Sequence, residues 1–157
     1  MGTSTPPTSL EAVQDKMTLI WRVGRADLPG LTYTPAEAIS AMMLYASRLV
    51  TLPGGPRIGD LAGVADAARF LLPGRDVLDL SLAEYVRAAE KHPGMTLECD
   101  GHTDATRLFA LVEEIGEVAA CLTYDNDAET GHGSDLESEV IQVAALALAW
   151  ATRYVNQ

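Results

Sequence analysis

Aromatic residues are scarce in this chain of 157 residues, at 6% of the sequence. Alanine and leucine supply most of the apolar content instead, and this balance favours helices over a β-sandwich or a β-barrel. No segment shows sustained alternation of apolar and polar residues, so the chain is predicted to be all-α. Hydrophobic residues at 48% and charged residues at 21% predict a folded globular protein rather than a disordered chain.

Long hydrophobic runs are also missing. The longest, residues 143–151, is far shorter than the roughly 20 residues that a membrane-spanning helix needs, so no membrane partner is expected. The chain has two cysteines, Cys99 and Cys121, and they lack the CxxC spacing. With no secretory signal visible, we expect reduced thiols in a cytoplasmic protein.

Positive charge is the third scarcity. Lysine and arginine number 11 against 22 acidic residues, which gives a formal net charge of −11. Most of this excess lies in residues 98–157, where Arg107 and Arg153 are the basic residues. A nucleic acid polymer is not expected as a partner, because phosphate neutralisation requires a basic face. A small polyanion could still bind if divalent cations screened the carboxylates.

Capping signals and breakers divide the chain into predicted helices. Four capping boxes, each a Ser or Thr followed three residues later by Glu, indicate helix starts. They are Thr8/Glu11, Thr34/Glu37, Ser81/Glu84 and Ser134/Glu137. Proline–glycine pairs separate the segments. The expected helices span residues 9–22, 35–50, 58–72, 81–91, 104–123 and 135–155.

The acidic character of the C-terminal part suggests an organisational boundary near residue 80. Residues 1–80 are predicted to be a helical N-terminal region of unknown role, and residues 81–157 a helical domain rich in carboxylates. The two regions could share one core. The glycine-rich segment 52–59 lacks the GxxxxGK[ST] pattern and a nearby lysine, so we expect a structural turn there rather than a phosphate loop.

The helix expected over residues 104–123 carries three glutamates that crowd one side. Glu113 lies four residues before Glu117, and Glu114 lies three residues before it. Like charges at these spacings repel each other, so a purely structural helix gains nothing from them, whereas a helix that binds divalent cations does. The alternative is that these acids form an ordinary solvated face.

The next helix supplies a complementary pair. Glu139 and Gln142 lie one turn apart, and apolar neighbours such as Val140 and Ile141 suggest that both point partly into a helix–helix interface. A buried glutamate that is neither paired nor bound to metal is costly. The loop over residues 123–133 is long enough to return an antiparallel helix. The two acidic faces could then meet and offer several oxygen ligands to Mg²⁺.

These two motifs carry a resemblance to a known family. An EExxE motif is present as Glu113-Glu114-Ile-Gly-Glu117, and Glu139-Val-Ile-Gln142 stands in the place of an ExxD motif. Over about residues 84–155 the chain resembles the MazG-like all-α nucleoside triphosphate pyrophosphohydrolases. The resemblance implies an antiparallel helix bundle of that type, with an N-terminal helical extension.

The resemblance also implies an activity, namely Mg²⁺-dependent hydrolysis of a nucleoside triphosphate to a monophosphate and pyrophosphate, with Mn²⁺ as an alternative cation. By position, the metal ligands would be Glu114, Glu117 and Glu139, and Glu113 would orient or deprotonate the attacking water. Gln142 departs from the family pattern, because its amide oxygen brings no charge to a metal. This departure leaves open a catalytically inactive nucleotide-binding module.

Other candidate substrate-binding residues have weaker support. Lys91, Arg107 and Arg153 are candidates for contacting the phosphates, with a solubilising surface role as the alternative for each. Trp150 is a candidate for stacking on a base, with core packing as its alternative.

The three histidines, His92, His102 and His132, lack mutual metal-ligand spacing and are expected in surface loops. Of these, His102 precedes the acidic helix together with Asp104, and this pair could border a pocket.

Oligomer formation is a further implication, because members of this family are usually dimers or tetramers that build their pockets between subunits. The alanine-rich face of residues 143–151 suits close helix packing of that kind. Residues 36–72 form another predicted helix–turn–helix, which could replace a partner subunit within one chain. A third reading is a purely helical interaction protein, with the glutamates as a solvated face.

Overall fold

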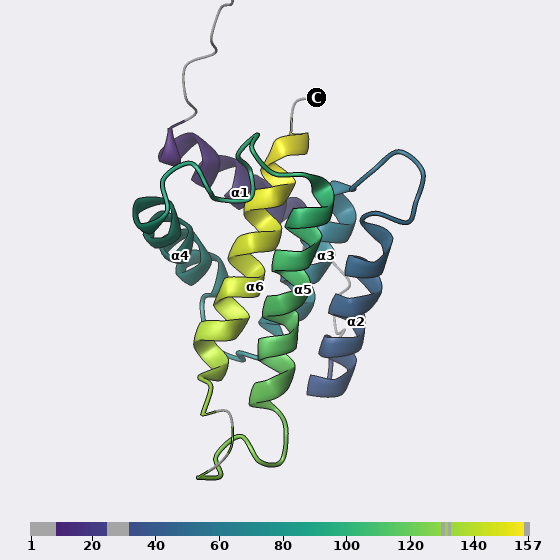
Figure 1. Ribbon diagram of the computed structural model, residues 1–157, viewed down its shortest axis with the longest axis vertical. Coiled ribbons are helices and arrows are strands. Elements are labelled where there is room, and N and C mark those ends of the chain that lie inside the picture. The colour runs from purple at the N-terminus through teal and green to yellow at the C-terminus, as the bar shows by residue number, and fades with distance from the viewer. Residues whose placement is uncertain (1–8, 25–31, 130, 132, 156–157) are drawn as a thin grey trace, which may run out of the picture.

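The structure, a computed structural model, describes residues 9–24, 32–129, 131 and 133–155. Over these ranges the chain forms six α-helices, a short 3-10 helix and no strand (Figure 1), so the prediction of an all-α protein is confirmed. The elements are α1 (Leu10–Gly24), α2 (Pro35–Arg48), α3 (Ile58–Arg69), α4 (Val77–Lys91), α5 (Asp104–Cys121), α6 (Leu136–Ala151) and η1 (Thr152–Tyr154).

The start of α2 matches its sequence signal. Thr34 accepts a hydrogen bond from the Glu37 amide at 3.3 Å, and the Glu37 carboxylate accepts one from the Thr34 amide at 2.7 Å. This reciprocal pair is a capping box, with Pro35 at the first helical position, where its missing N–H costs nothing. Thr8, the first residue of another expected box, lies outside the described residues.

The prediction of a capping box at Ser81 is wrong. Helix α4 begins at Val77, because Asp76 caps it by accepting a hydrogen bond from the Asp79 amide at 3.0 Å. Ser81 lies inside the helix, where its buried hydroxyl donates to the Val77 carbonyl oxygen at 2.6 Å. Serine can satisfy its hydroxyl in this way within a helix, so its presence alone does not indicate a start.

The capping box predicted at Ser134 and Glu137 is also wrong. Asp135 caps α6 instead, by accepting hydrogen bonds from the amide and the hydroxyl of Ser138. Aspartate is at least as good an N-cap as serine, and here it shifts the start by one residue.

Helix α6 is the centre of the arrangement. It runs antiparallel to α5, and it packs against α3, α4 and α1 as well (Figure 1). Helices α2 and α3 form a second antiparallel pair, which contacts the first pair through α3 with α6 and α2 with α5. Ten of the residues of α6 are buried, because a helix that is covered on several sides has little surface left for polar groups.

The hydrophobic core is continuous across residue 80, and that position falls inside α4. Val13, Met42 and Leu61 from the N-terminal part belong to the same buried cluster as Leu111 and Trp150. The helical N-terminal region and the acidic helices therefore pack together around shared side chains.

Among the described helices, none combines the length and apolar content that crossing a bilayer requires.

Leu111→Ala should destabilise the fold strongly. Leu111 is fully buried on α5, so its truncation should lower the free energy of unfolding by about 2–5 kcal/mol. The matched control is Leu19→Ala on α1, where the side chain is 52% exposed and the change should stay within about 0.5 kcal/mol. Urea denaturation measures both variants, and equal losses would contradict this packing.

Candidate functional site

The three glutamates of α5 differ in exposure. Leu111, Ile115 and Val118 form the buried stripe of this helix, which fixes its rotation about its axis. Glu114 is adjacent to that stripe and is half-buried, whereas Glu113 is exposed. The helix therefore directs one carboxylate toward the protein interior and others toward solvent.

Glu139 and Gln142 occupy the first turns of α6, and both are half-buried. The Gln142 amide lies 3.5 Å from Oε2 of Glu139 and donates a long hydrogen bond to it. This contact is consistent with the predicted orientation, in which both polar side chains point partly into a helix–helix contact.

Glu114 has a strongly perturbed acidity. Burial is the main cause, and it raises the pKa of this carboxyl to about 7. Neighbouring negative charges raise the pKa further. They belong to Glu139, Glu113, Glu117 and Glu84, in decreasing order of effect. Burial and like charge thus both favour the neutral form of Glu114.

Glu139 shares this environment. Burial is again the first cause that raises the pKa of Glu139, followed by the charges of Glu117 and Asp135. A side-chain hydrogen bond with Glu114 acts in the opposite direction, as expected when a protonated carboxyl donates to an ionised one. Glu114 and Glu139 therefore interact across the contact between α5 and α6.

Nearby acids on α4 and α6 are neutralised in a different way. Glu84 accepts two hydrogen bonds from Arg87, at 2.6 and 2.7 Å, and Glu137 accepts one from Arg75 at 2.8 Å. Glu114 and Glu139 have a carboxyl group as neighbour where Glu84 and Glu137 have a guanidinium. A bound cation would neutralise the charge of such a carboxyl pair.

The donor chemistry at this place fits a hard divalent cation. Carboxylate and amide oxygens are the ligands that Mg²⁺ prefers, and Glu114, Glu139 and Gln142 offer these atoms. In the side-chain arrangement of the described residues, no three His, Cys, Asp or Glu side chains already converge as a metal site. A cation that bound here would favour the ionised forms of Glu114 and Glu139.

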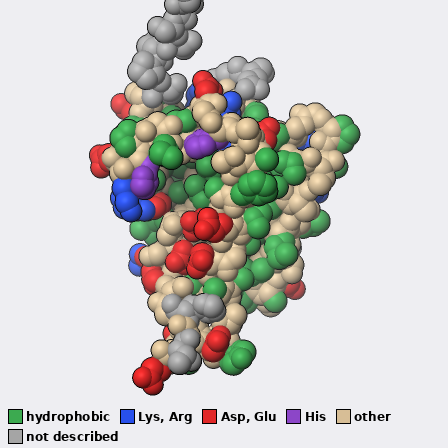
Figure 2. All heavy atoms as spheres, viewed as in Figure 1, with side chains coloured by type: hydrophobic (Ala, Val, Ile, Leu, Met, Phe, Trp, Pro, Cys, Tyr) green, Lys and Arg blue, Asp and Glu red, His purple; other side chains and the backbone are tan. Residues whose placement is uncertain are grey.

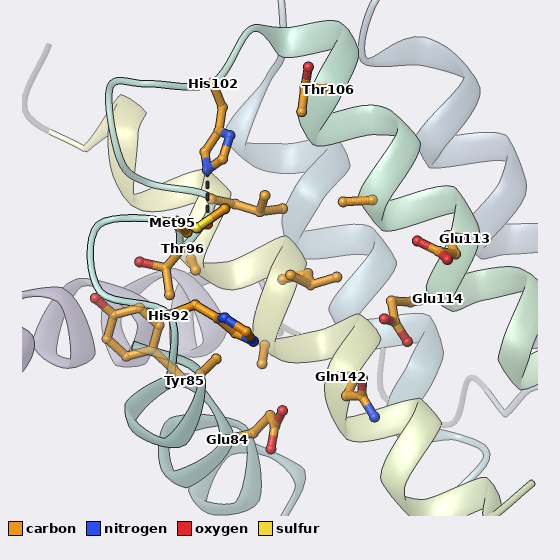
Figure 3. Close-up of a pocket in the computed structure, with 16 residues that line it drawn as sticks. Glu84, Tyr85, His92, Met95, Thr96, His102, Thr106, Glu113, Glu114 and Gln142 are labelled. Atoms are coloured by element: carbon orange, nitrogen blue, oxygen red, sulfur yellow. Dashed lines mark hydrogen bonds between the residues drawn. The ribbon is translucent and has the colours of Figure 1, made fainter. Parts of the chain in front are cut away.

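A cavity of about 280 Å³ adjoins these carboxylates. Helix α4, the segment 92–103, α5 and α6 enclose it, and Figure 3 shows Glu113, Glu114 and Gln142 at one end with His102 and Met95 toward the other. Its remaining walls are largely apolar. They include Ala88, Leu97, Ala110, Ala145, Leu146 and Ala149. A pocket with apolar walls and a few polar groups is the usual form of a small-molecule site.

The outer surface shows the same separation into an acidic part and an apolar part. In Figure 2, acidic side chains gather over the middle of α5 and α6, and a hollow with hydrophobic walls and histidine at its edge lies above them. His92 and His102 both line the cavity, while its described lining contains neither lysine nor arginine. The site is thus acidic at one end and apolar beyond it.

Two candidate substrate-binding residues, Trp150 and Arg107, do not line the cavity. Trp150 is fully buried, and its indole N–H donates to the Tyr154 hydroxyl at 3.0 Å, so its ring is not available to a base. Arg107 is 2% exposed, and its guanidinium donates to the carbonyl oxygens of Leu97 and Cys99. Both side chains thus have partners inside the protein, and for Trp150 this is the core packing given as the alternative.

Arg153 and Lys91 have different positions. Arg153 donates to the Glu98 carbonyl oxygen and to the Asp100 carboxylate, and it lines a separate small hollow near the C-terminal end. It does not reach the acidic pair. Lys91 is exposed at the last position of α4, directly before His92 of the cavity wall, so it stays a candidate for contacting phosphates.

Several cavity residues were missed from the sequence. Glu84 and Ala88 share one face of α4, and His92 follows the helix end at the same spacing of four residues, a signal that was present but pointed to no known motif. Tyr85 and Met95 gave no signal. The prediction that His102 borders a pocket is confirmed, although Asp104 does not line it. His132 lies outside the described residues.

Comparison of the chain with models of known protein families, with curated proteins and with solved structures found no match. The site is therefore interpreted from its own residues.

The acidity of Glu114 predicts a pH-dependent stability. Its folded pKa of about 7 exceeds the ordinary value of 4.5, so the folded state holds a proton that the unfolded state releases between these values. The stabilisation is complete below about pH 4.5 and is lost as the pH rises to about 7. Thermal unfolding in EDTA should therefore show a fall in Tm from pH 5 to pH 8.

Glu114→Gln tests the origin of this fall. A neutral amide removes the proton linkage, so this variant should lose less Tm between pH 5 and pH 8 and should exceed the parent at pH 8. Glu90→Gln, at an exposed position of α4, is the control and should behave as the parent does. Parallel pH profiles for the parent and Glu114→Gln would contradict the assignment.

Proposed function

We propose that this protein is a Mg²⁺-dependent nucleoside triphosphate pyrophosphohydrolase of the MazG-like all-α type, acting on a cytoplasmic nucleotide. The observation that carries the proposal is the position of the apolar cavity, which ends at Glu113, Glu114 and Gln142. A nucleoside in the cavity would place its triphosphate beside the carboxylates. The site thus matches a ligand with one apolar end and one polyanionic end.

The acidic residues divide the work between holding a cation and activating water. Glu114, Glu117 and Glu139 would hold Mg²⁺, with Mn²⁺ as a substitute, and the Gln142 oxygen would be a weaker ligand. The cation would neutralise phosphate charge and lower the pKa of a bound water. Glu113 is exposed at the cavity end and would orient this water or accept its proton during attack on the α-phosphorus. Pyrophosphate and a nucleoside monophosphate would then be released.

The scarcity of positive charge supports a cation-dependent binding mode. The described cavity lining has two histidines and no lysine or arginine, so a triphosphate would meet mainly negative groups there. A divalent cation resolves that conflict, since it attracts both the carboxylates and the phosphates. Lys91, exposed beside His92, could contribute one further positive charge.

A nucleotide-binding protein without turnover is the second candidate. It is favoured by Gln142, whose amide is turned toward Glu139 and which adds no charge to a metal site. Such a protein would bind a nucleotide with Mg²⁺ and release it unchanged. Both candidates share the cavity and differ only in the chemistry at its acidic end.

A hydrolysis assay with a panel of NTPs and dNTPs, in which pyrophosphate release is measured, separates these candidates. We expect release that depends on Mg²⁺ for at least one nucleotide, and a loss of more than about 100-fold in kcat/KM for Glu114→Gln and Glu139→Gln, because each removes a metal ligand. Glu90→Gln is the control and should retain activity, since Glu90 is exposed on α4.

The other outcomes are equally informative. Binding by calorimetry without pyrophosphate release, unchanged in Gln142→Asp, would favour the nucleotide-binding protein. Absence of both binding and release, with no Mg²⁺-dependent rise in Tm, would leave a purely helical interaction protein and would refute the proposed enzyme.

We also propose that the protein forms a homodimer or homotetramer. Phe109 and Val112 are 70% and 49% exposed on α5, one turn apart, and Figure 2 shows hydrophobic side chains gathered over α5 and α2. Gly116 continues this face, and a Cβ added there would meet nothing within 4 Å. A glycine inside a helix costs about 1 kcal/mol relative to alanine, which is reasonable where another helix approaches closely.

Light scattering after size-exclusion chromatography tests this arrangement. The parent should have the mass of a dimer or tetramer, and Phe109→Glu should shift it toward the monomer, because a charge would be buried in the contact. Leu19→Glu, at an exposed position of α1, should leave the mass unchanged. A monomeric parent at micromolar concentration would refute the oligomer.

A further inference from the structure

Two arginines bind three consecutive backbone carbonyls of the segment 92–103. Arg107 donates from Nε to the Leu97 carbonyl oxygen and from Nη2 to that of Cys99, both at 2.7 Å. Arg153 donates from Nη1 to the intervening Glu98 carbonyl oxygen, also at 2.7 Å. One arginine belongs to α5 and the other to η1, so the segment is held from two elements.

The guanidinium of Arg107 is held in place. Its side chain is almost fully buried, and Nη1 donates to the Asp104 carboxylate at 3.0 Å. Asp104 also lies within 3.4 Å of the Tyr154 hydroxyl. A buried charge requires such partners, and arginine can bind several acceptors at once because its planar group has five N–H donors. Lysine could not reproduce this geometry.

The bound segment forms a wall of the cavity. Met95, Thr96 and Leu97 line the space directly, and His102 lines it from the end of the same segment. These positions follow α4 and precede α5, in a stretch without regular helix or strand. Such a stretch has many backbone conformations, so external hydrogen bonds are needed to fix one of them.

Side-chain contacts assist the arginines. The Glu98 carboxylate accepts hydrogen bonds from the hydroxyls of Tyr85 at 2.6 Å and Thr96 at 2.7 Å. Burial and the adjacent Glu98 raise the pKa of the Tyr85 phenol, which keeps it protonated as a donor. A ring nitrogen of His102 lies 2.8 Å from the Met95 carbonyl oxygen, and Figure 3 shows this contact across the segment.

We infer that Arg107 and Arg153 are positioning residues for the nucleoside end of the site, which they preorganise by fixing the backbone of residues 97–99. This inference rests on the proposed function and adds a separate claim, that binding of the nucleoside and chemistry at the phosphates depend on different residues. Preorganisation lowers the cost of ordering a site when a ligand binds.

This division has a kinetic consequence. Loosening the segment should weaken nucleotide binding and raise KM, while the glutamates on α5 and α6 keep their places and kcat changes little. A residue that only stabilised the fold would change the amount of active protein and leave KM as it was. The split between KM and kcat therefore distinguishes positioning from stability.

The test uses Arg107→Lys and Arg153→Lys in the full chain. Both keep the charge. Arg107→Lys loses the paired carbonyl contacts of the guanidinium, and Arg153→Lys replaces the nitrogen that bonds the Glu98 carbonyl oxygen and the Asp100 carboxylate. Arg153 is the safer of the two because it is partly exposed. Arg69→Lys is the matched control, since Arg69 pairs with Asp66 on α3 in an ordinary i, i+3 contact. Cys121→Ser is present in every protein, so that Cys99 reports on the segment.

The first readout is alkylation of Cys99 with iodoacetamide, which needs no nucleotide. Cys99 is half-buried, and its thiol lies 3.5 Å from the Thr96 hydroxyl. We expect alkylation of Arg107→Lys and Arg153→Lys to be at least about tenfold faster than that of the parent. The Arg69→Lys rate should equal the parent rate. Equal rates in all four proteins would overturn the inference, whatever the binding results.

The second readout is the Kd for α,β-imido nucleoside triphosphates with Mg²⁺, together with KM and kcat for the best substrate. In Arg107→Lys and Arg153→Lys, Kd and KM should rise about tenfold, and kcat should stay within twofold of the parent value. A loss confined to kcat, with Kd unchanged in a folded Arg153→Lys protein, would overturn the inference. If the parent itself binds no analogue, the proposed function fails, and the alkylation rates still decide whether the arginines hold the segment.

Discussion

Helix α6 is covered on several sides at once, and this constraint determines where the acidic groups can go. Its contacts with α3, α4, α5 and α1 leave almost no exposed surface along its C-terminal half. Polar side chains are confined to its first turns, where Glu139 and Gln142 meet Glu114 of α5. The packing that stabilises the protein thus also brings two carboxyl groups together, at a cost that a shared proton or a bound cation can offset.

Four arginines in this part of the described structure bind groups other than the acidic pair. Arg87 and Arg75 form ion pairs with Glu84 and Glu137 on α4 and α6. Arg107 and Arg153 donate hydrogen bonds to backbone carbonyl oxygens of the cavity wall. Positive charge is scarce in the sequence, and in the structure these arginines bind other groups and position segments. The site therefore keeps its acidic character.

Helix positions could be predicted well, because caps, breakers and the 3.6-residue period are local features of the sequence. The largest error in a helix start, at α4, arose because Ser81 resembles a cap but bonds a carbonyl oxygen one turn earlier, whereas the start of α6 was displaced by one residue. The approach of Glu114 to Glu139 was also predictable, since the apolar stripe of α5 fixes the rotation of that helix and the apolar run of α6 leaves polar positions only in its first turns. The roles of Arg107 and Trp150 were not, because their partners Leu97, Cys99 and Tyr154 depend on the course of the chain between and after helices.

A crystal of the protein grown with Mn²⁺ would test the central claim most directly, because anomalous scattering locates this ion independently of any assay. The account predicts an anomalous peak between α5 and α6, at coordination distance of roughly 2.0–2.6 Å from carboxylate oxygens of both Glu114 and Glu139. A crystal in which Glu114 and Glu139 stay hydrogen-bonded to each other, with Mn²⁺ absent or bound only elsewhere, would contradict it.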